Sequence, residues 1–184
     1  VEGVTLSAFG YQGQKCSACS RAIVVGAVYD QFLARLSDQA SHLRVGPAED
    51  PASFMGPVIN ERAMAKILEY IDVGDRDGRL LTGGTRARGE GYFLEPTIIA
   101  DVHRTSRLFQ EEVFGPVLSV TRARDFDHAL ELANDTEYGL TGAVFTNDRA
   151  KLEQASREFF AGNLYLNRKC TGAMVGAHPF GGFN

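Results

Sequence analysis

The sequence has 184 residues, enough for one well-formed hydrophobic core. Hydrophobic residues make up 44% and charged residues 23%, proportions that exclude a disordered or fibrous chain. The formal net charge is -4, so composition predicts neither a nucleic acid nor a membrane surface as partner. The longest apolar run, residues 22–28, is far shorter than the roughly 20 residues that span a bilayer.

Three cysteines, an odd number, argue against a disulfide framework and favour a reducing compartment. We therefore expect the cytoplasm, or the mitochondrial matrix in a eukaryote. The chain opens without Met and closes on a Gly-rich segment, residues 180–184. This pattern predicts a piece of a longer protein, whose exposed docking surface would make the piece prone to self-association.

The first half of the chain predicts a short apolar helix, a buried strand and two longer helices. Residues 22–28 read as a strand buried on both faces, and the apolar spacing from Tyr29 to Leu43 predicts a helix. A connector rich in Pro and Gly, residues 46–57, separates this helix from a second one. Asn60 is the expected N-cap of the second helix, and Gly74 is its expected end.

In the second half, short apolar segments alternate with helical patterns that start at Asp125 and Asp148. Residues 83–92, rich in Gly and charge, predict a hairpin or a surface excursion. The alternation indicates an α/β fold with a parallel-rich open sheet and crossover helices, in one domain over residues 1–184. The expected strands are residues 80–81, 97–100, 117–120, 142–145 and 164–166.

Cys16 and Cys19 form a C-x-x-C pair between the short helix and the first strand, and the residues alone leave four interpretations open. The pair could be a redox couple, although such couples usually precede a helix. It could bind zinc with Cys170 and His178, although that spacing is not a recurring one. Both thiols could be structural. Finally, Cys16 alone could be a nucleophile, favoured by Lys15 and by backbone N–H groups of the turn.

Other chemistry-bearing patterns are absent from the sequence. The four histidines have no metal-ligand spacing, and residues 75–78 lack the first and last carboxylates of a calcium loop. No phosphate-binding Gly-rich fingerprint follows a predicted strand. We therefore expect no metal.

Several motifs, in the same order, resemble the aldehyde dehydrogenase superfamily, and the likeness runs over essentially all 184 residues. The phrasing around Cys16 and Cys170 resembles one branch of it, the glutamate semialdehyde (1-pyrroline-5-carboxylate) dehydrogenases, and matches the C-terminal catalytic part of such enzymes. The superfamily motifs are residues 12–16 (QGQKC), 111–117 (EEVFGPV), Asn167 and 179–182 (PFGG), and the branch motifs are 13–21 (GQKCSACSR) and 167–173 (NRKCTGA).

The resemblance implies a role for each matched position. Cys16 would add to the aldehyde carbon, with its own N–H stabilising the oxyanion. Glu112 would accept hydrogen bonds from the ribose of a nicotinamide cofactor, NAD or alternatively NADP, and Phe114 would pack beside the nicotinamide. Without the resemblance, residues 111–112 would read as a solvated acidic pair and Phe114 as a core aromatic.

The branch resemblance adds a site for a small aldehyde that carries a carboxylate. The Ser17 hydroxyl and the backbone N–H groups of Gly172 and Ala173 would hold that carboxylate. Phe180 would flank the aliphatic part of the substrate, against the alternative of simple loop packing.

The same resemblance implies what these residues lack. The family's water-activating Glu, its second oxyanion donor and its nucleotide-binding domain have no counterpart in the sequence, and neither does the tail that builds family oligomers. The parent is therefore expected to be a homo-oligomer and the isolated piece to be inactive. A thiol-redox or metal-binding module and a non-catalytic assembly domain of the same fold remain the alternatives.

Overall fold

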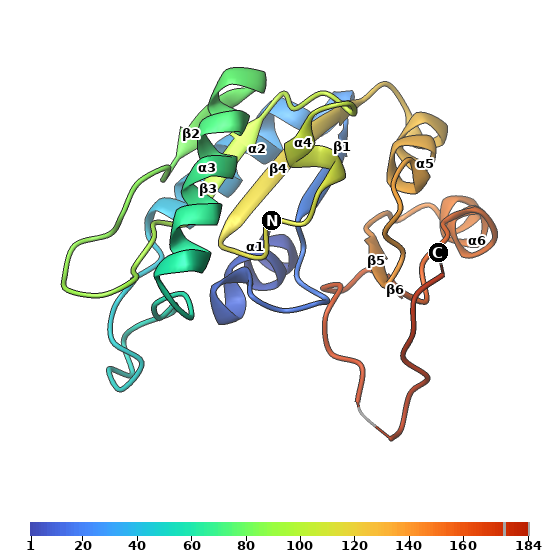
Figure 1. Ribbon diagram of the computed structural model, residues 1–184. Coiled ribbons are helices and arrows are strands. Elements are labelled where there is room, and N and C mark those ends of the chain that lie inside the picture. The colour runs from blue at the N-terminus through green and yellow to red at the C-terminus, as the bar shows by residue number, and fades with distance from the viewer. Residues whose placement is uncertain (175, 184) are drawn as a thin grey trace.

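The computed structural model describes residues 1–174 and 176–183, which form two sheets flanked by helices (Figure 1). The elements in chain order are α1 Glu2–Phe9, η1 Gly10–Gly13, β1 Arg21–Val25, α2 Gly26–Ser41, α3 Glu61–Asp77, β2 Arg79–Thr82, β3 Thr97–Ala100, α4 Arg107–Gln110, β4 Val117–Ala123, α5 Phe126–Asn134, β5 Thr141–Val144, α6 Arg149–Glu158 and β6 Asn163–Leu166. Among the described residues, no helix is both long and apolar enough to span a bilayer.

The larger sheet has the order β1-β4-β3-β2, with β1, β4 and β3 parallel and β2 antiparallel to β3. Its two faces are both covered, because successive β3 side chains enter different apolar clusters. Ile98 and Ala100 pack with residues of α1 and α2, whereas Ile99 packs with residues of α3 and α4. A strand buried on both faces reads as a continuous apolar run, which explains why the sequence placed β3 at its observed bounds.

The smaller sheet pairs β5 with β6 in parallel, and α6 forms the crossover between them. It has its own apolar cluster, centred on Leu130 of α5, Val144 of β5 and Ala155 of α6. The predicted α/β fold with parallel-rich pairing and crossover helices is confirmed, but β4 and the pair β5-β6 belong to different sheets. The helix α5 packs against β1 and β4 as well as α6, so the chain crosses from one sheet to the other after this helix.

Helix starts were predicted more accurately than helix ends. Asn60, Asp125 and Asp148 each cap a helix with a side-chain oxygen, as expected. Gly74, however, does not end α3, which continues to Asp77. A Cβ at Gly74 would overlap Ile99 and lie 2.7 Å from Leu108, so this glycine allows α3 to approach the sheet closely.

Of two further expectations, one differs from the structure at its border and the other is confirmed. The strand expected over residues 22–28 is shorter, because α2 already begins at Gly26. The Gly-rich stretch 83–92 lies in the connection between the antiparallel strands β2 and β3, as predicted for a hairpin or surface excursion. An isolated antiparallel bridge between Arg86 and Leu94 continues the pairing into that connection.

Candidate active site

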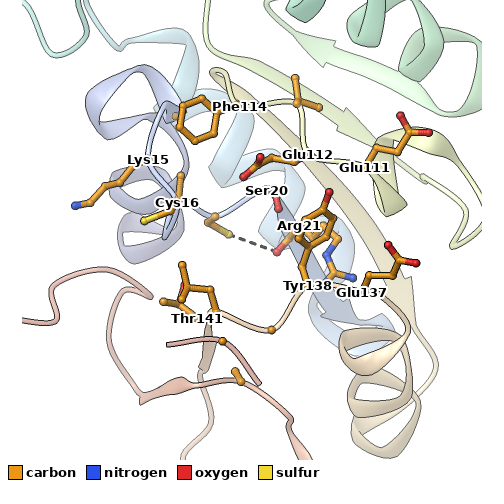
Figure 2. A pocket seen from close by; sticks show the side chains of 18 of the residues that line it. Lys15, Cys16, Ser20, Arg21, Glu111, Glu112, Phe114, Glu137, Tyr138 and Thr141 are labelled. Atoms are coloured by element: carbon orange, nitrogen blue, oxygen red, sulfur yellow. Dashed lines mark hydrogen bonds between the residues drawn. The ribbon is translucent and has the colours of Figure 1, made fainter. Parts of the chain in front are cut away.

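A cavity of about 300 Å³ opens where three loops meet (Figure 2). One wall runs from the end of η1 to the start of β1 and consists of Gly13, Lys15, Cys16 and residues 18–21. A second wall runs from the end of α4 into β4 and consists of residues 111–115 and Val117. The third wall is formed by residues 137–141, which connect α5 to β5. Figure 2 shows Cys16 and Glu112 on neighbouring loops, with Tyr138 and Thr141 facing them.

Cys16 lies in a tight turn that presents its side chain to this cavity. The turn is closed by the Ala18 N–H, which donates to the Lys15 carbonyl at 2.9 Å. Its end is fixed to α1 because the Cys19 N–H donates to the Ser7 carbonyl at 3.0 Å. Cys16 itself is exposed and is not buried among apolar side chains. A small electrophile can therefore reach this sulfur.

Lys15, on the same turn, also lines the cavity. Its ammonium lies 5.2 Å from the centroid of the Tyr11 ring, a cation–π arrangement that keeps a positive charge near the turn.

Close backbone contact holds the Cys16 segment against the Glu112 segment. Gly13 has φ of +63°, and a Cβ at this position would overlap the carbonyl group of Gly115. The same Cβ would lie 2.9 Å from the Ala8 carbonyl oxygen. Only glycine satisfies both the left-handed backbone and the close approach. The two motifs, about one hundred residues apart in the sequence, are thus joined at the cavity wall.

The two neighbouring glutamates have different partners. Glu111 pairs with Arg107 at 3.1 Å and accepts a hydrogen bond from the Tyr70 hydroxyl, and these contacts lower the pKa of Glu111. Glu112 is held through its backbone carbonyl, which accepts from Lys66 Nζ at 2.9 Å. Its carboxylate makes no hydrogen bond or ion pair with any other described residue. Figure 2 shows the two side chains leaving the loop in different directions.

This difference follows from the local backbone. Glu111 is extended, with φ of -112° and ψ of 154°, and successive side chains of an extended segment point to opposite sides. Both glutamates line the cavity, but the Glu111 carboxylate is held by side chains of α3 and α4, whereas the Glu112 carboxylate points elsewhere (Figure 2). An unengaged carboxylate offers two acceptor oxygens to the hydroxyl groups of a ligand.

Phe114 lines the same cavity and is 40% exposed, so it is not the core aromatic of the alternative interpretation. Its φ of +59° is uncommon for a residue with a large side chain. Such a strained backbone persists only where neighbouring contacts fix it. Here the backbone is fixed by the Lys66 hydrogen bond to the Glu112 carbonyl and by the close approach of Gly13 to Gly115. The result is an apolar ring face presented to solvent beside an acidic group.

None of the four residues predicted to bind substrate is among the residues that line this cavity. Ser17 is only 4% exposed. Gly172, Ala173 and Phe180 lie in the segment that follows β6, and none of them is among the cavity-lining residues. Gly172 is exposed and has φ of +120°, a value that glycine adopts readily. The roles of these four residues stay predictions.

The structure adds Arg21 and the third wall, which the sequence analysis missed. The Arg21 guanidinium stacks over Phe109 at 4.7 Å and donates to the Ala133 carbonyl at 3.3 Å, and burial lowers its pKa. One of its nitrogens, Nη1, is buried without a hydrogen-bond partner among the described residues. Residues 137–141 carry no motif, and only an exposed Tyr138 next to a glycine could have suggested a binding loop.

The zinc interpretation gains no support from the geometry. Across residues 1–174 and 176–183, no three His, Cys, Asp or Glu side chains cluster closely enough to hold a metal ion. His178 accepts a hydrogen bond from the Met174 N–H at 3.1 Å, so this ring has a local structural partner.

Comparison with known proteins places this cavity in context. A profile of the aldehyde dehydrogenase family matches residues 1–184. The chain belongs to the aldehyde dehydrogenase family. Members of this family share the chain's mixed α/β fold with a parallel-rich sheet.

Two curated relatives of this aldehyde dehydrogenase chain are bacterial proteins named 1-pyrroline-5-carboxylate dehydrogenase. The protein from Geobacillus sp. (strain WCH70) is 57% identical over 183 residues, which cover 100% of this chain and 36% of the relative. The protein from Bacillus subtilis (strain 168) is 54% identical over 181 residues, which cover 98% of this chain and 35% of the relative. The chain thus spans about a third of the length of these relatives.

Solved structures agree with this assignment. A 1-pyrroline-5-carboxylate dehydrogenase from Thermus with bound NAD superimposes with a TM-score of 0.96 at 54% identity, covering 99% of this chain and 35% of the other. Betaine aldehyde dehydrogenase from Staphylococcus aureus in complex with NAD+ superimposes with a TM-score of 0.93 at 34% identity, covering 99% and 37%.

Proposed function

We propose that this chain is the catalytic portion of an enzyme that oxidises glutamate semialdehyde to glutamate, with NAD as the hydride acceptor. One observation carries the proposal: the exposed Cys16 thiol shares a cavity with the unengaged carboxylate of Glu112 and the exposed ring of Phe114. The names of the relatives, which point to 1-pyrroline-5-carboxylate as substrate, support the choice of aldehyde.

Cys16 acts as the nucleophile. Its thiolate adds to the aldehyde carbon, and the electrons of the C=O bond move to oxygen to give a thiohemiacetal anion. The Cys16 N–H is the donor from this chain that stabilises the anion. When the C=O bond re-forms, the carbon loses its hydrogen as hydride, and a thioester remains on Cys16. Water then attacks the thioester, and the carboxylic acid and the free thiol are released.

The residues that face Cys16 fit a nicotinamide nucleotide. The Glu112 carboxylate can accept hydrogen bonds from two ribose hydroxyls, because an ionised carboxylate only accepts. The exposed face of Phe114 offers an apolar surface to a planar ring. When bound, the cofactor accepts the hydride released from the carbon. The bound NAD named for the Thermus relative favours NAD over NADP.

Substrate selection is assigned to the segment that follows β6. The backbone N–H groups of Gly172 and Ala173 hold the substrate carboxylate, and the exposure and positive φ of Gly172 suit such an anion-binding turn. Phe180, which is 50% exposed, covers the aliphatic part of the substrate. Ser17, a residue that is 4% exposed, contributes its hydroxyl to the same group from the turn that also holds Cys16.

The test compares two cysteines three positions apart in the full-length protein that carries this sequence. Cys16→Ala should lower glutamate semialdehyde oxidation by at least about a thousandfold, because removal of a nucleophile leaves only binding contributions. Cys19→Ala serves as the matched control and should retain most of the activity. Oxidation that is unchanged in Cys16→Ala would remove the proposal.

The isolated 184-residue chain gives a second test. Iodoacetamide should alkylate Cys16 in the folded protein, as judged by mass spectrometry of the peptide that contains it. NADH formation, followed by absorbance, should be negligible, because hydride transfer needs a cofactor held within about 3.5 Å of the reacting carbon. Rapid NADH production by this chain would contradict the assignment of cofactor binding to a larger protein.

A further inference from the structure

Two of the three thiols lie next to each other, and the proposed reaction uses neither. The Cys170 side chain lies against the turn that ends at Cys19, although the two cysteines are far apart in the sequence, and both line one cavity. The Cys19 Sγ lies 3.4 Å from the Arg21 carbonyl oxygen, and the Cys170 Sγ lies 3.5 Å from the Ser17 carbonyl oxygen. The spatial partner of Cys19 is therefore Cys170, and the C-x-x-C motif does not describe the thiol pair that the fold builds.

The surroundings make the two sulfurs chemically unequal. Hydrogen bonding from the Cys19 thiol, with further hydrogen bonds from the side chains of Ser7 and Thr141, lowers the pKa of Cys170 to about 7. The contact with Cys170 and burial raise the pKa of Cys19 well above its usual value. Near neutral pH, Cys170 is therefore the more readily ionised of the two thiols. A low-pKa thiolate beside a second thiol is the arrangement from which disulfides form.

Small molecules have a route to this pair. Both cysteines line a second cavity of about 660 Å³, which runs between β1 and β5 and is also lined by Ser7 and Thr141. Cys19 in addition lines the cavity that contains Cys16. Cys170 is 7% exposed and Cys19 packs against an apolar cluster, and this cavity is what gives small molecules access to them.

We propose that Cys19 and Cys170 form a reversible disulfide when the protein meets a peroxide. The Cys170 thiolate attacks one oxygen of hydrogen peroxide, the O–O bond breaks, and the departing hydroxide takes a proton to become water. Cys170 is now a sulfenic acid. The Cys19 sulfur attacks it, the S–O bond breaks, and the oxygen leaves as a second water with the proton of Cys19. Two thiols are oxidised, one peroxide is reduced, and Cys16 keeps its thiol.

The new bond would connect two loops of the site. Cys19 ends the turn that presents Cys16, and Cys170 directly precedes the segment that contains Gly172. A covalent link between them fixes the distance between the nucleophile turn and the segment assigned to the substrate carboxylate. Oxidation by peroxide would thus change the geometry of the site and leave the Cys16 thiol intact.

The experiment uses the 184-residue chain with an equimolar amount of hydrogen peroxide. Free thiols are then alkylated and the digested protein is analysed by mass spectrometry. The expected product is a pair of peptides that contain Cys19 and Cys170, joined by a bond that dithiothreitol cleaves, with Cys16 alkylated. A link between Cys16 and Cys19, or Cys170 oxidised without a link, overturns the proposal.

Three variants separate the proposed pair from a chance cross-link. Cys16→Ser should form the same linked peptides as the wild type at a similar rate. Cys19→Ser and Cys170→Ser should each lose them, and circular dichroism checks that both remain folded. In the wild type, the rate of linkage should rise with pH through about 7, following ionisation of Cys170. A rate that depends on Cys16 would refute direct oxidation of the pair. This outcome is independent of dehydrogenase activity and leaves the proposed function untouched.

Discussion

Substitution of Gly13 by alanine tests the close contact between the Cys16 motif and the Glu112 motif, because it adds a single methyl group where the two backbones meet. The Gly13 φ of +63° is left-handed, and placing an alanine there costs about 1–2 kcal/mol. The added Cβ would also overlap the Gly115 carbonyl, which is backbone and cannot rotate away. Forcing extra volume into a closed contact costs about 1–3 kcal/mol more. We therefore expect Gly13→Ala to lower the free energy of unfolding by about 2–5 kcal/mol.

Gly10→Ala is the matched control, three residues earlier on the same segment. Gly10 has φ of -57°, and a Cβ built there meets nothing within 4 Å. This variant should be neutral or more stable by less than about 1 kcal/mol. Urea unfolding followed by circular dichroism measures both, and the rate of Cys16 alkylation reports whether the turn has moved. A Gly13→Ala protein within about 0.5 kcal/mol of wild type would refute the packing argument.

Three other substitutions probe separate parts of the molecule. Tyr29→Phe removes a hydroxyl that donates to Asp101 Oδ1 at 2.9 Å and accepts from the Asp101 N–H at 3.0 Å, so urea unfolding should show a loss of about 1–3 kcal/mol at neutral pH. Burial raises the pKa of Tyr29 to about 12, so the folded state keeps a proton that the unfolded state loses near pH 10. The free energy of unfolding of the wild type should therefore fall as pH rises from about 10 toward 12. Tyr29→Phe has no phenol to ionise at this position and should lack this part of the pH dependence. In the full-length enzyme, Glu112→Gln should raise the KM for NAD about tenfold in steady-state assays, since a charged hydrogen-bond acceptor is replaced by a neutral one. Glu111→Gln should leave this KM near the wild-type value. Equal effects of the two substitutions would contradict the assignment of cofactor binding to Glu112 alone. Asn60→Ala removes the cap to the Ala63 N–H at 2.9 Å and should cost about 1 kcal/mol in urea unfolding, whereas Asn60→Ser should retain most of the stability.

Helix starts and buried strands were predictable because their signals are local. A side chain at Asn60, Asp125 or Asp148 satisfies backbone donors of its own helix, so the sequence around each cap contains the whole interaction. Gly74 was misjudged because its role is to let Ile99 and Leu108 approach, and that contact depends on residues distant in the chain. The split into two sheets escaped prediction for the same reason.

The candidate site divides along the same line. Motifs resembling those of a known family identified Cys16, Glu112 and Phe114, and the fold brings them to one cavity. Nothing in the sequence distinguished Glu112 from Glu111 by contacts, which required the positions of Arg107 and Tyr70. The approach of Cys170 to the turn that ends at Cys19 was likewise hidden, because the C-x-x-C spacing suggests only a local partner.

The smaller sheet has a consequence for how the molecule comes apart. Among residues 1–174 and 176–183, the buried apolar residues of its separate cluster are Leu130, Val144 and Ala155, against a much larger set around β3 and β4. Regions with few buried contacts open with a smaller free energy than the rest of a protein. The strands β5 and β6 should therefore open while the larger sheet stays intact. Because residues 137–141 lead into β5, each such opening removes one wall of the cavity around Cys16.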